Sequence, residues 1–147
     1  MISTRNVLGG ALLASLLAMS GCGMMPMSKM SSATSQMSAA QEVPANSSSG
    51  KGTVVTSLDK ATRMLRWTVT YSGLTGPVSA GHFHGPAASG ANAGVVVPFT
   101  GSMASPIEGS ATLTEAQMAD LVAGKWYANL HTAAHPGGEI RGQVTGN

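Results

Sequence analysis

The sequence predicts an all-β protein, a Greek-key β-sandwich with one short inserted helix, preceded by a signal peptide and a flexible tether. Glycine is abundant, with 19 residues in a chain of 147, and only 10% of the residues are charged. From Gly50 onward, short segments rich in Val, Thr and aromatic residues alternate with turn-forming residues. The single cysteine excludes an internal disulfide, but roughly 100 residues can bury a core without one.

The N-terminal segment predicts a signal peptide over residues 1–21. Arg5 supplies a positive charge, and the apolar run from Val7 to Ala18 follows it. This run is too short to span a bilayer as a helix, which needs about 20 apolar residues. The small residues Ser20 and Gly21 come next, as expected before a cleavage site.

Cys22 stands immediately after this boundary, and the stretch from Leu17 to Cys22 resembles a lipobox. The resemblance implies that Cys22 is acylated and becomes the mature N-terminus, although Met19 stands where a lipobox usually carries leucine. The alternative is an ordinary cleaved leader with an incidental cysteine. Acylation would anchor the protein to a membrane by lipid alone. Gly23 replaces the aspartate associated with inner-membrane retention, so we expect the periplasmic face of the outer membrane or the cell surface.

Residues 22–37 are interpreted as a tether, because they are rich in Ser, Met and Ala without any periodicity. The methionines of this region could collect Cu(I), for which thioethers are suitable ligands, or they could reflect drift in an unconstrained linker. The folded domain is expected over residues 38–147.

Within this domain the strands follow in order. Residues 64–71 alternate most clearly, with Leu65, Trp67, Val69 and Tyr71 on one face, as in a half-buried antiparallel strand. The other expected strands are Gly52–Leu58, Val78–His84, Ala93–Phe99, Gly109–Leu113, Trp126–Thr132 and Glu139–Val144.

One helix is expected after Leu113. Thr114 and Gln117 form a capping-box pattern, and Met118, Leu121 and Val122 give an apolar stripe. Gly124 is expected to end the helix.

The four histidines of the chain fall into two places. His82 and His84 are two apart on an expected strand, so both imidazoles project from one face. His131 ends the Trp126 strand, and His135 lies four residues further on. If these strands are neighbours, four imidazoles converge, and such a set suits copper or zinc better than magnesium or calcium. The alternative is that the histidines only make structural hydrogen bonds.

Several ordered motifs together resemble the CHRD domain, a module named after chordin that is common in exported bacterial proteins. The motifs are Gln41-Glu42-Val43-Pro44, Gly73-Leu74-Thr75-Gly76, Gly81-His82-Phe83-His84-Gly85, Tyr127-Ala128-Asn129-Leu130-His131-Thr132 and Pro136-Gly137-Gly138-Glu139-Ile140-Arg141-Gly142-Gln143. The resemblance runs from about Met37 to Val144 and implies an exported β-sandwich. It does not carry over the growth-factor binding of chordin itself.

A more distant resemblance concerns copper/zinc superoxide dismutases, which are also Greek-key sandwiches. Gly73-Leu74-Thr75 followed by Gly81-His82-Phe83-His84 is similar to the stretch that supplies two copper ligands. This resemblance implies copper ligation by His82 and His84, with His131 as a third ligand. The bridging histidine, the zinc-site aspartate and the disulfide of that family have no counterpart here, so copper is expected rather than zinc. Arg141 could attract anions to such a site, or pair with a carboxylate.

Composition and motifs exclude several other functions. A net charge of +2 without a basic stripe argues against nucleic-acid binding. No nucleophile elbow, P-loop or acid/base carboxylate pair is present, so nothing in the sequence requires catalysis. Three hypotheses remain: a lipid-anchored envelope protein that binds a transition metal, most plausibly copper, through clustered histidines; a copper-dependent redox enzyme acting on superoxide; and a structural or protein-interaction module.

Overall fold

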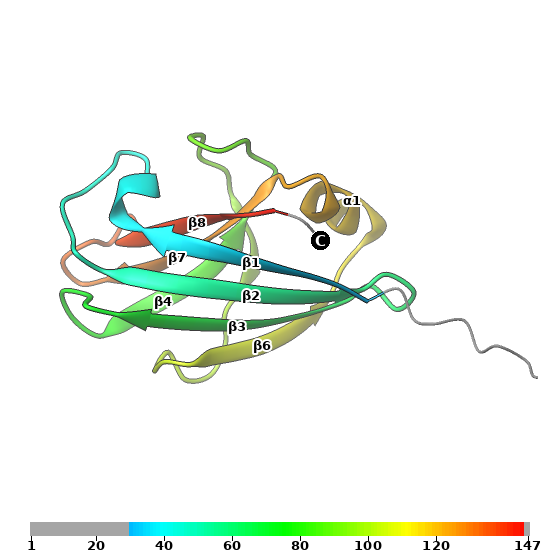
Figure 1. Ribbon diagram of the computed structural model, residues 1–147, viewed down its shortest axis with the longest axis horizontal. Coiled ribbons are helices and arrows are strands. Elements are labelled where there is room, and N and C mark those ends of the chain that lie inside the picture. The colour runs from blue at the N-terminus through cyan, green and yellow to red at the C-terminus, as the bar shows by residue number, and fades with distance from the viewer. Residues whose placement is uncertain (1–29, 146–147) are drawn as a thin grey trace, which may run out of the picture.

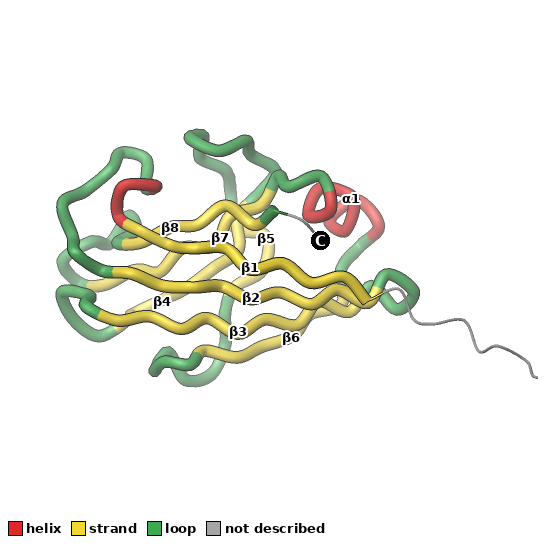
Figure 2. Tube along the Cα trace, in the orientation of Figure 1, coloured by secondary structure: helices red, strands yellow, loops and turns green. Residues whose placement is uncertain are grey.

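The computed structural model describes residues 30–145. The predicted signal peptide, Cys22 and residues 23–29 of the predicted tether lie outside the described residues. One eight-stranded antiparallel sheet makes up most of the described part, as Figures 1 and 2 show. Its strands are β1 (Met30–Ser38), β2 (Lys51–Asp59), β3 (Met64–Ser72), β4 (Val78–His84), β5 (Val95–Pro98), β6 (Ile107–Thr112), β7 (Trp126–Thr132) and β8 (Ile140–Val144).

The order of the strands in the sheet is β5-β4-β7-β8-β1-β2-β3-β6. The pairs β4–β7, β1–β8 and β3–β6 join strands that are distant in sequence, as expected for Greek-key connections. The sheet curls so that the half with β4 and β7 lies behind the half with β1, β2 and β3 (Figure 1). The predicted all-β class with one short helix is thus confirmed, and the two layers belong to one continuous sheet.

The start of the domain differs from the sequence prediction. Residues 30–37, which were expected in the tether, form most of β1, and this strand pairs with β2 over its full length. Met37 on β1 is only 1% exposed. The alternation of this strand is hard to recognise because its inward residues include the small Ala33 and Ser35 beside Met37. Hydropathy therefore changes little between the two faces of β1.

Aromatic rings fill the space between the two layers. Phe83 of β4 lies edge-on to Trp67 of β3, with ring centroids 5.3 Å apart, and Phe99 stacks on Trp67 at 5.4 Å. Trp126 of β7 lies 5.9 Å from Phe83. The alternation predicted for β3 is confirmed, since Leu65, Trp67 and Val69 are buried. Because the inward positions are mostly apolar, the polar side chains of β4 and β7 lie mainly on the outward face.

The helix α1 (Glu115–Val122) begins at the predicted capping box. The backbone N–H of Gln117 donates to Thr114 Oγ1 at 3.2 Å, and the Thr114 N–H donates to Gln117 Oε1 at 2.9 Å. Gly124 follows the helix with φ +70°, a conformation that favours glycine. The predicted apolar stripe is wrong at Val122, which is 40% exposed, whereas Leu121 is buried as expected.

A buried carboxylate joins three loops at one end of the sheet. Glu139 is 0% exposed, and its oxygens accept hydrogen bonds from Ser48 Oγ at 2.6 Å and Thr132 Oγ1 at 2.6 Å. Thr75 adds two more, from its backbone N–H and its hydroxyl, both at 2.8 Å. Burial alone would raise the pKa of Glu139, but these hydrogen bonds lower it to about 2. The loop before β2, the loop before β4 and the end of β7 are thereby tied to β8.

Candidate metal centre

The outward face of β4, β7 and β8 is polar yet covered. In β7 six of the seven residues are buried, on both faces of the sheet. The segment 85–94 explains this burial, because it lies over the outward face and is held there by hydrogen bonds. Ala87 N–H donates to Lys125 O at 2.8 Å, and Gln143 Nε2 donates to Ala87 O at 3.0 Å. Side chains on this face therefore sit partly out of water.

Three of the four histidines meet on this face. His82 and His84 project outward from β4, and β4 pairs with β7, which carries His131. His82 Nδ1 lies 3.1 Å from His131 Nε2. Potential ligand atoms of the three side chains all lie within 4.8 Å of one another, and no other group of this kind was found in residues 30–145. The prediction that the two histidine-bearing strands are neighbours is confirmed. The triad could hold a metal ion.

Backbone carbonyls orient two of these rings. His84 Nδ1 lies 2.9 Å from Ala93 O, in the covering segment, and His131 Nδ1 lies 2.9 Å from Pro136 O. A carbonyl only accepts, so both Nδ1 atoms carry the proton. In the neutral imidazoles the Nε2 atoms are then free to act as ligands. The same division of roles is usual in metal-binding histidines, whose second nitrogen donates to a backbone carbonyl or carboxylate.

A stack of planar groups fixes His84 further. Its ring lies parallel to that of Tyr127, with an interplanar angle of 1° and centroids 4.8 Å apart. The guanidinium carbon of Arg141 lies 3.4 Å from the centroid of Tyr127, on which it makes a cation–π contact. The ring of His84 is therefore held by a hydrogen bond along its edge and by stacking on one face.

The histidines are biased toward the neutral form. Burial lowers the pKa of His82 below 6.5, and the nearby His131 and His84 lower it further. Burial also lowers the pKa of His131, although the hydrogen bond to Pro136 opposes this shift. Since a metal competes with protons for the same lone pairs, neutral imidazoles near pH 7 favour metal uptake.

The other two predicted site residues are placed differently. His135 is not part of the triad, and it lines a separate depression of about 280 Å³ with Pro44 and Gly137. Arg141 is only 2% exposed, and it donates to Asn92 Oδ1 at 2.9 Å and to Ala91 O. Its guanidinium thus anchors the covering segment, which leaves little of it to attract anions from solution.

Comparison with known protein families gives one match, to the CHRD domain, over residues 33–144. The chain belongs to the CHRD domain family. The matched region begins within β1 and ends at the last residue of β8, so it covers the whole sheet. Comparison with curated proteins and with solved structures found no match. In residues 30–145 no helix is long and apolar enough to cross a membrane.

Two residues of this CHRD domain were missed as site residues by the sequence reasoning. Asn129 lies on the same face of β7 as His131, and its Oδ1 is 3.1 Å from His84 Nε2 and 3.0 Å from His131 Nε2. Glu42 is 7% exposed and lies behind Asn129. Burial raises the pKa of Glu42 to about 7, against the lowering effect of Arg141. The period of two along β7 could have identified Asn129, whereas no local pattern marks Glu42.

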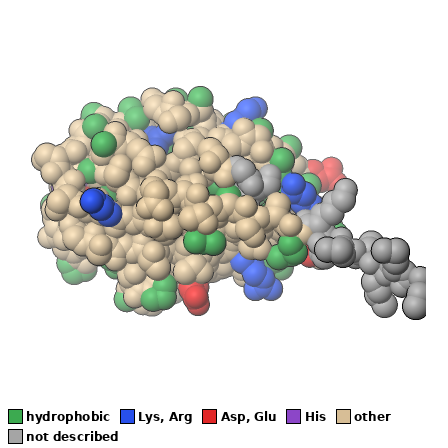
Figure 3. Space-filling model, viewed as in Figure 1, with side chains coloured by type: hydrophobic (Ala, Val, Ile, Leu, Met, Phe, Trp, Pro, Cys, Tyr) green, Lys and Arg blue, Asp and Glu red, His purple; other side chains and the backbone are tan. Residues whose placement is uncertain are grey.

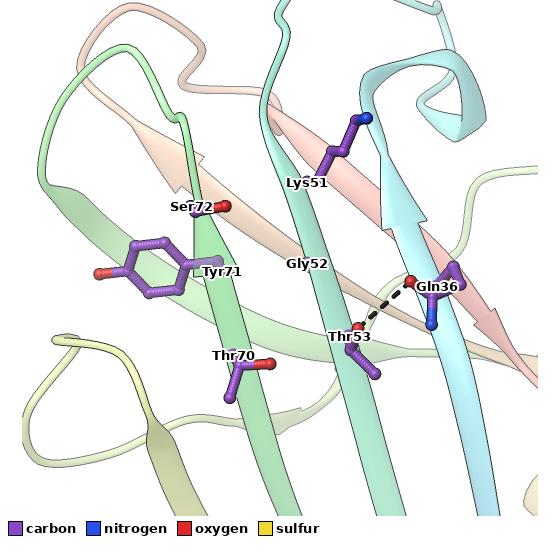
Figure 4. A pocket seen from close by; sticks show the side chains of 7 residues that line it. All are labelled: Gln36, Lys51, Gly52, Thr53, Thr70, Tyr71 and Ser72. Carbon is purple, nitrogen blue, oxygen red and sulfur yellow. Dashed lines mark hydrogen bonds between the residues drawn. The ribbon is translucent and has the colours of Figure 1, made fainter.

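On the side formed by β1, β2 and β3, residues 30–145 contain no comparable cluster of possible metal ligands. Figure 3 shows a face of backbone and uncharged side chains, with scattered hydrophobic side chains, a few separate charges and no histidine. A shallow depression of about 210 Å³ lies across β1, β2 and β3, where Thr53 donates to Gln36 Oε1 at 3.2 Å (Figure 4). Hydroxyl and amide groups line it together with the single cation of Lys51. The histidine triad is therefore the stronger candidate site.

Proposed function

We propose that this CHRD domain binds one transition-metal ion, copper, through His82, His84 and His131. The observation that carries the proposal is the convergence of the three side chains, with two rings oriented by backbone carbonyls. Burial of polar groups normally costs free energy unless they are paired. Three imidazoles that gather on one covered face, with pKa values lowered in two of them, are well suited to a cation as their partner.

The donor set supports copper and disfavours hard cations. Imidazole nitrogen suits Cu, Zn, Fe and Ni, whereas Mg and Ca prefer oxygen ligands. Copper binds such sites more tightly than the other divalent metals of its row. Three imidazoles can also hold zinc when water completes the coordination, so the preference for copper rests on its higher affinity for such donors. Selective retention of Cu(II) over Zn(II) is therefore part of the proposal.

Metal content after loading tests this function. The metal-free chain is incubated with Cu(II) or Zn(II), freed of excess metal and measured by elemental analysis, and its affinity is obtained by competition with a chelator. We expect one copper ion per chain. The His82→Ala/His131→Ala variant is expected to lose at least about 100-fold in Cu(II) affinity, or about 2.7 kcal/mol, because two of three nitrogen ligands are gone.

His135→Ala is the matched control, because His135 lies outside the triad. It should load copper like the unsubstituted chain. Retention of tight one-to-one loading by the double variant would refute the proposal, and so would loss of binding in His135→Ala alone.

We also propose that acylation of Cys22 anchors the domain to the cell envelope, on the side that faces the periplasm or the exterior. The lipobox-like stretch ending at Cys22 supports this proposal. The unsubstituted chain, expressed in a bacterium, is expected to incorporate labelled palmitate and to fractionate with membranes. Cys22→Ala should remove both properties, because one thiol is available for the lipid. Membrane association without label would point to another anchor.

A further inference from the structure

Asn129 lies beside the histidine triad and contacts two of its members. In the sheet it lies between His82 of β4 and Arg141 of β8, to which it is directly paired. The residue is 3% exposed. Its Oδ1 lies within hydrogen-bond distance of Nε2 in both His84 and His131. A buried amide in this position must have its oxygen and its nitrogen satisfied by neighbours.

The protons on the two rings leave this oxygen without a donor. Because Nδ1 of His84 and Nδ1 of His131 both donate to backbone carbonyls, each neutral ring presents a lone pair at Nε2. Both lone pairs point at Asn129 Oδ1, which is itself an acceptor. Oδ1 lies 3.1 Å from His84 Nε2 and 3.0 Å from His131 Nε2, and each of these contacts between two acceptors is repulsive unless a cation lies among them. A metal ion would convert this repulsion into coordination.

Glu42 fixes the direction of the amide. The Asn129 amide lies beside the Glu42 carboxyl and lowers its pKa, with Nδ2 on the side of Gly138 and Glu42 and Oδ1 on the side of the histidines. Both groups pack against Gly138, where an added Cβ would lie 2.5 Å from Glu42 Oε1 and 2.9 Å from Asn129 Nδ2. The absence of a side chain at Gly138, whose φ is +128°, thus allows the carboxyl to reach the amide. The orientation of the Asn129 amide therefore depends on three separate segments, which carry Asn129, Glu42 and Gly138.

We propose that Asn129 Oδ1 is the fourth protein ligand of the metal ion, so that the site offers three imidazole nitrogens and one amide oxygen. This inference rests on the proposed metal-binding function and adds a fourth protein ligand to it. Glu42 acts as a positioning residue, because it touches the amide and reaches the metal only through it.

The spacing of the donors favours Cu(II) over Zn(II). Two ligand atoms about 3.0 Å apart subtend roughly 90° at a metal with bonds of about 2.1 Å, whereas a tetrahedral site separates them by about 3.4 Å. The separations of Oδ1 from the two Nε2 atoms are 3.1 and 3.0 Å. Tetragonal sets of nitrogen and oxygen are typical of Cu(II) and Ni(II). Asn129 would therefore contribute to the discrimination against zinc.

The test compares Cu(II) and Zn(II) affinities and the Cu(II) electron paramagnetic resonance spectrum in the full-length chain and its variants. Asn129→Ala is expected to keep one-to-one Cu(II) loading, to lose 10- to 100-fold in Cu(II) affinity and to change the spectrum. Its Zn(II) affinity should fall less. Asn129→Asp, which retains an oxygen in the same place, should restore most of the Cu(II) affinity. Gln36→Ala removes an amide from β1, away from the triad, and should leave the spectrum unchanged.

An Asn129→Ala variant with the spectrum and affinity of the unsubstituted chain would overturn this inference while leaving the histidine site intact. Absence of copper binding in the unsubstituted chain would instead refute the proposed function, and the inference with it. If Asn129→Ala does not fold, the Cu(II) affinity and spectrum of Asn129→Asp are compared with those of the unsubstituted chain instead. A spectrum of the unsubstituted chain with four nitrogen couplings, in place of three, would also overturn the oxygen ligand.

Discussion

Replacement of Glu139 by alanine is expected to lower the free energy of unfolding by about 3 kcal/mol. The carboxylate accepts four hydrogen bonds from three segments, and its removal leaves the Thr75 N–H and three hydroxyls without this partner. The lowered pKa of Glu139, about 2 against 4.5, corresponds to a stabilisation of the same order. Denaturant unfolding of both proteins at pH 7 measures the difference, which for about 100 residues amounts to roughly 15 °C in Tm.

The pH dependence of this difference identifies its cause. A carboxyl whose pKa is lowered on folding stabilises the protein above its unfolded pKa, here near 4.5, and this stabilisation is lost as the pH falls toward about 2. The difference in the free energy of unfolding between the parent chain and Glu139→Ala should therefore become smaller as the pH falls from about 4.5 toward about 2. Glu108→Ala, on the exposed face of β6, is the matched control and should change stability by less than about 0.5 kcal/mol. A decrease of less than about 1 kcal/mol in the free energy of unfolding of Glu139→Ala would show that the hydrogen bonds to this carboxylate contribute little to stability.

Gly142→Ala is expected to destabilise the fold by about 2 to 3 kcal/mol. Gly142 lies where β8 meets β1, and these two strands join the two halves of the sheet. An added Cβ would lie 2.5 Å from the backbone oxygen of Gln36 and 2.9 Å from Met37 Cγ. A backbone oxygen cannot turn away as a side chain can, so β8 would have to move away from β1. Thermal unfolding followed by circular dichroism measures the effect.

Gly137→Ala provides the comparison, because nothing lies within 4 Å of the Cβ it would add and its φ is not in the left-handed region. This variant should unfold within a few degrees of the parent chain. Equal stability of the Gly142 and Gly137 variants would contradict the close approach of β8 to β1.

The sequence allowed prediction of the parts of the site that depend on local periodicity. His82 and His84 share a face because side chains alternate along a strand, and this holds in β4. His131 could be added once its strand was placed beside theirs, which required the additional assumption that β4 and β7 are neighbours. His135 lies beyond the end of β7, where the alternation of a strand no longer applies. It lines the separate depression with Pro44 and Gly137.

Other features depend on contacts between distant segments. Glu42 reaches the site from the 3-10 turn Ala39–Gln41, more than 80 residues before Asn129, and only the packing against Gly138 brings them together. Arg141 was expected to attract anions or to pair with a carboxylate, but the covering segment and Tyr127 occupy its guanidinium. β1 escaped recognition because Ala and Ser fill inward positions that usually carry Val or Ile.

The position of copper in a crystal of the loaded chain tests the central claim most directly. Anomalous diffraction measured on both sides of the copper edge locates the ion without assumptions about its ligands. We expect one strong peak among His82, His84 and His131, with Nε2 of His84 and His131 at about 2.0 to 2.1 Å from it. A fully loaded chain whose only peak lies elsewhere, for example at His135, would refute copper binding at the triad.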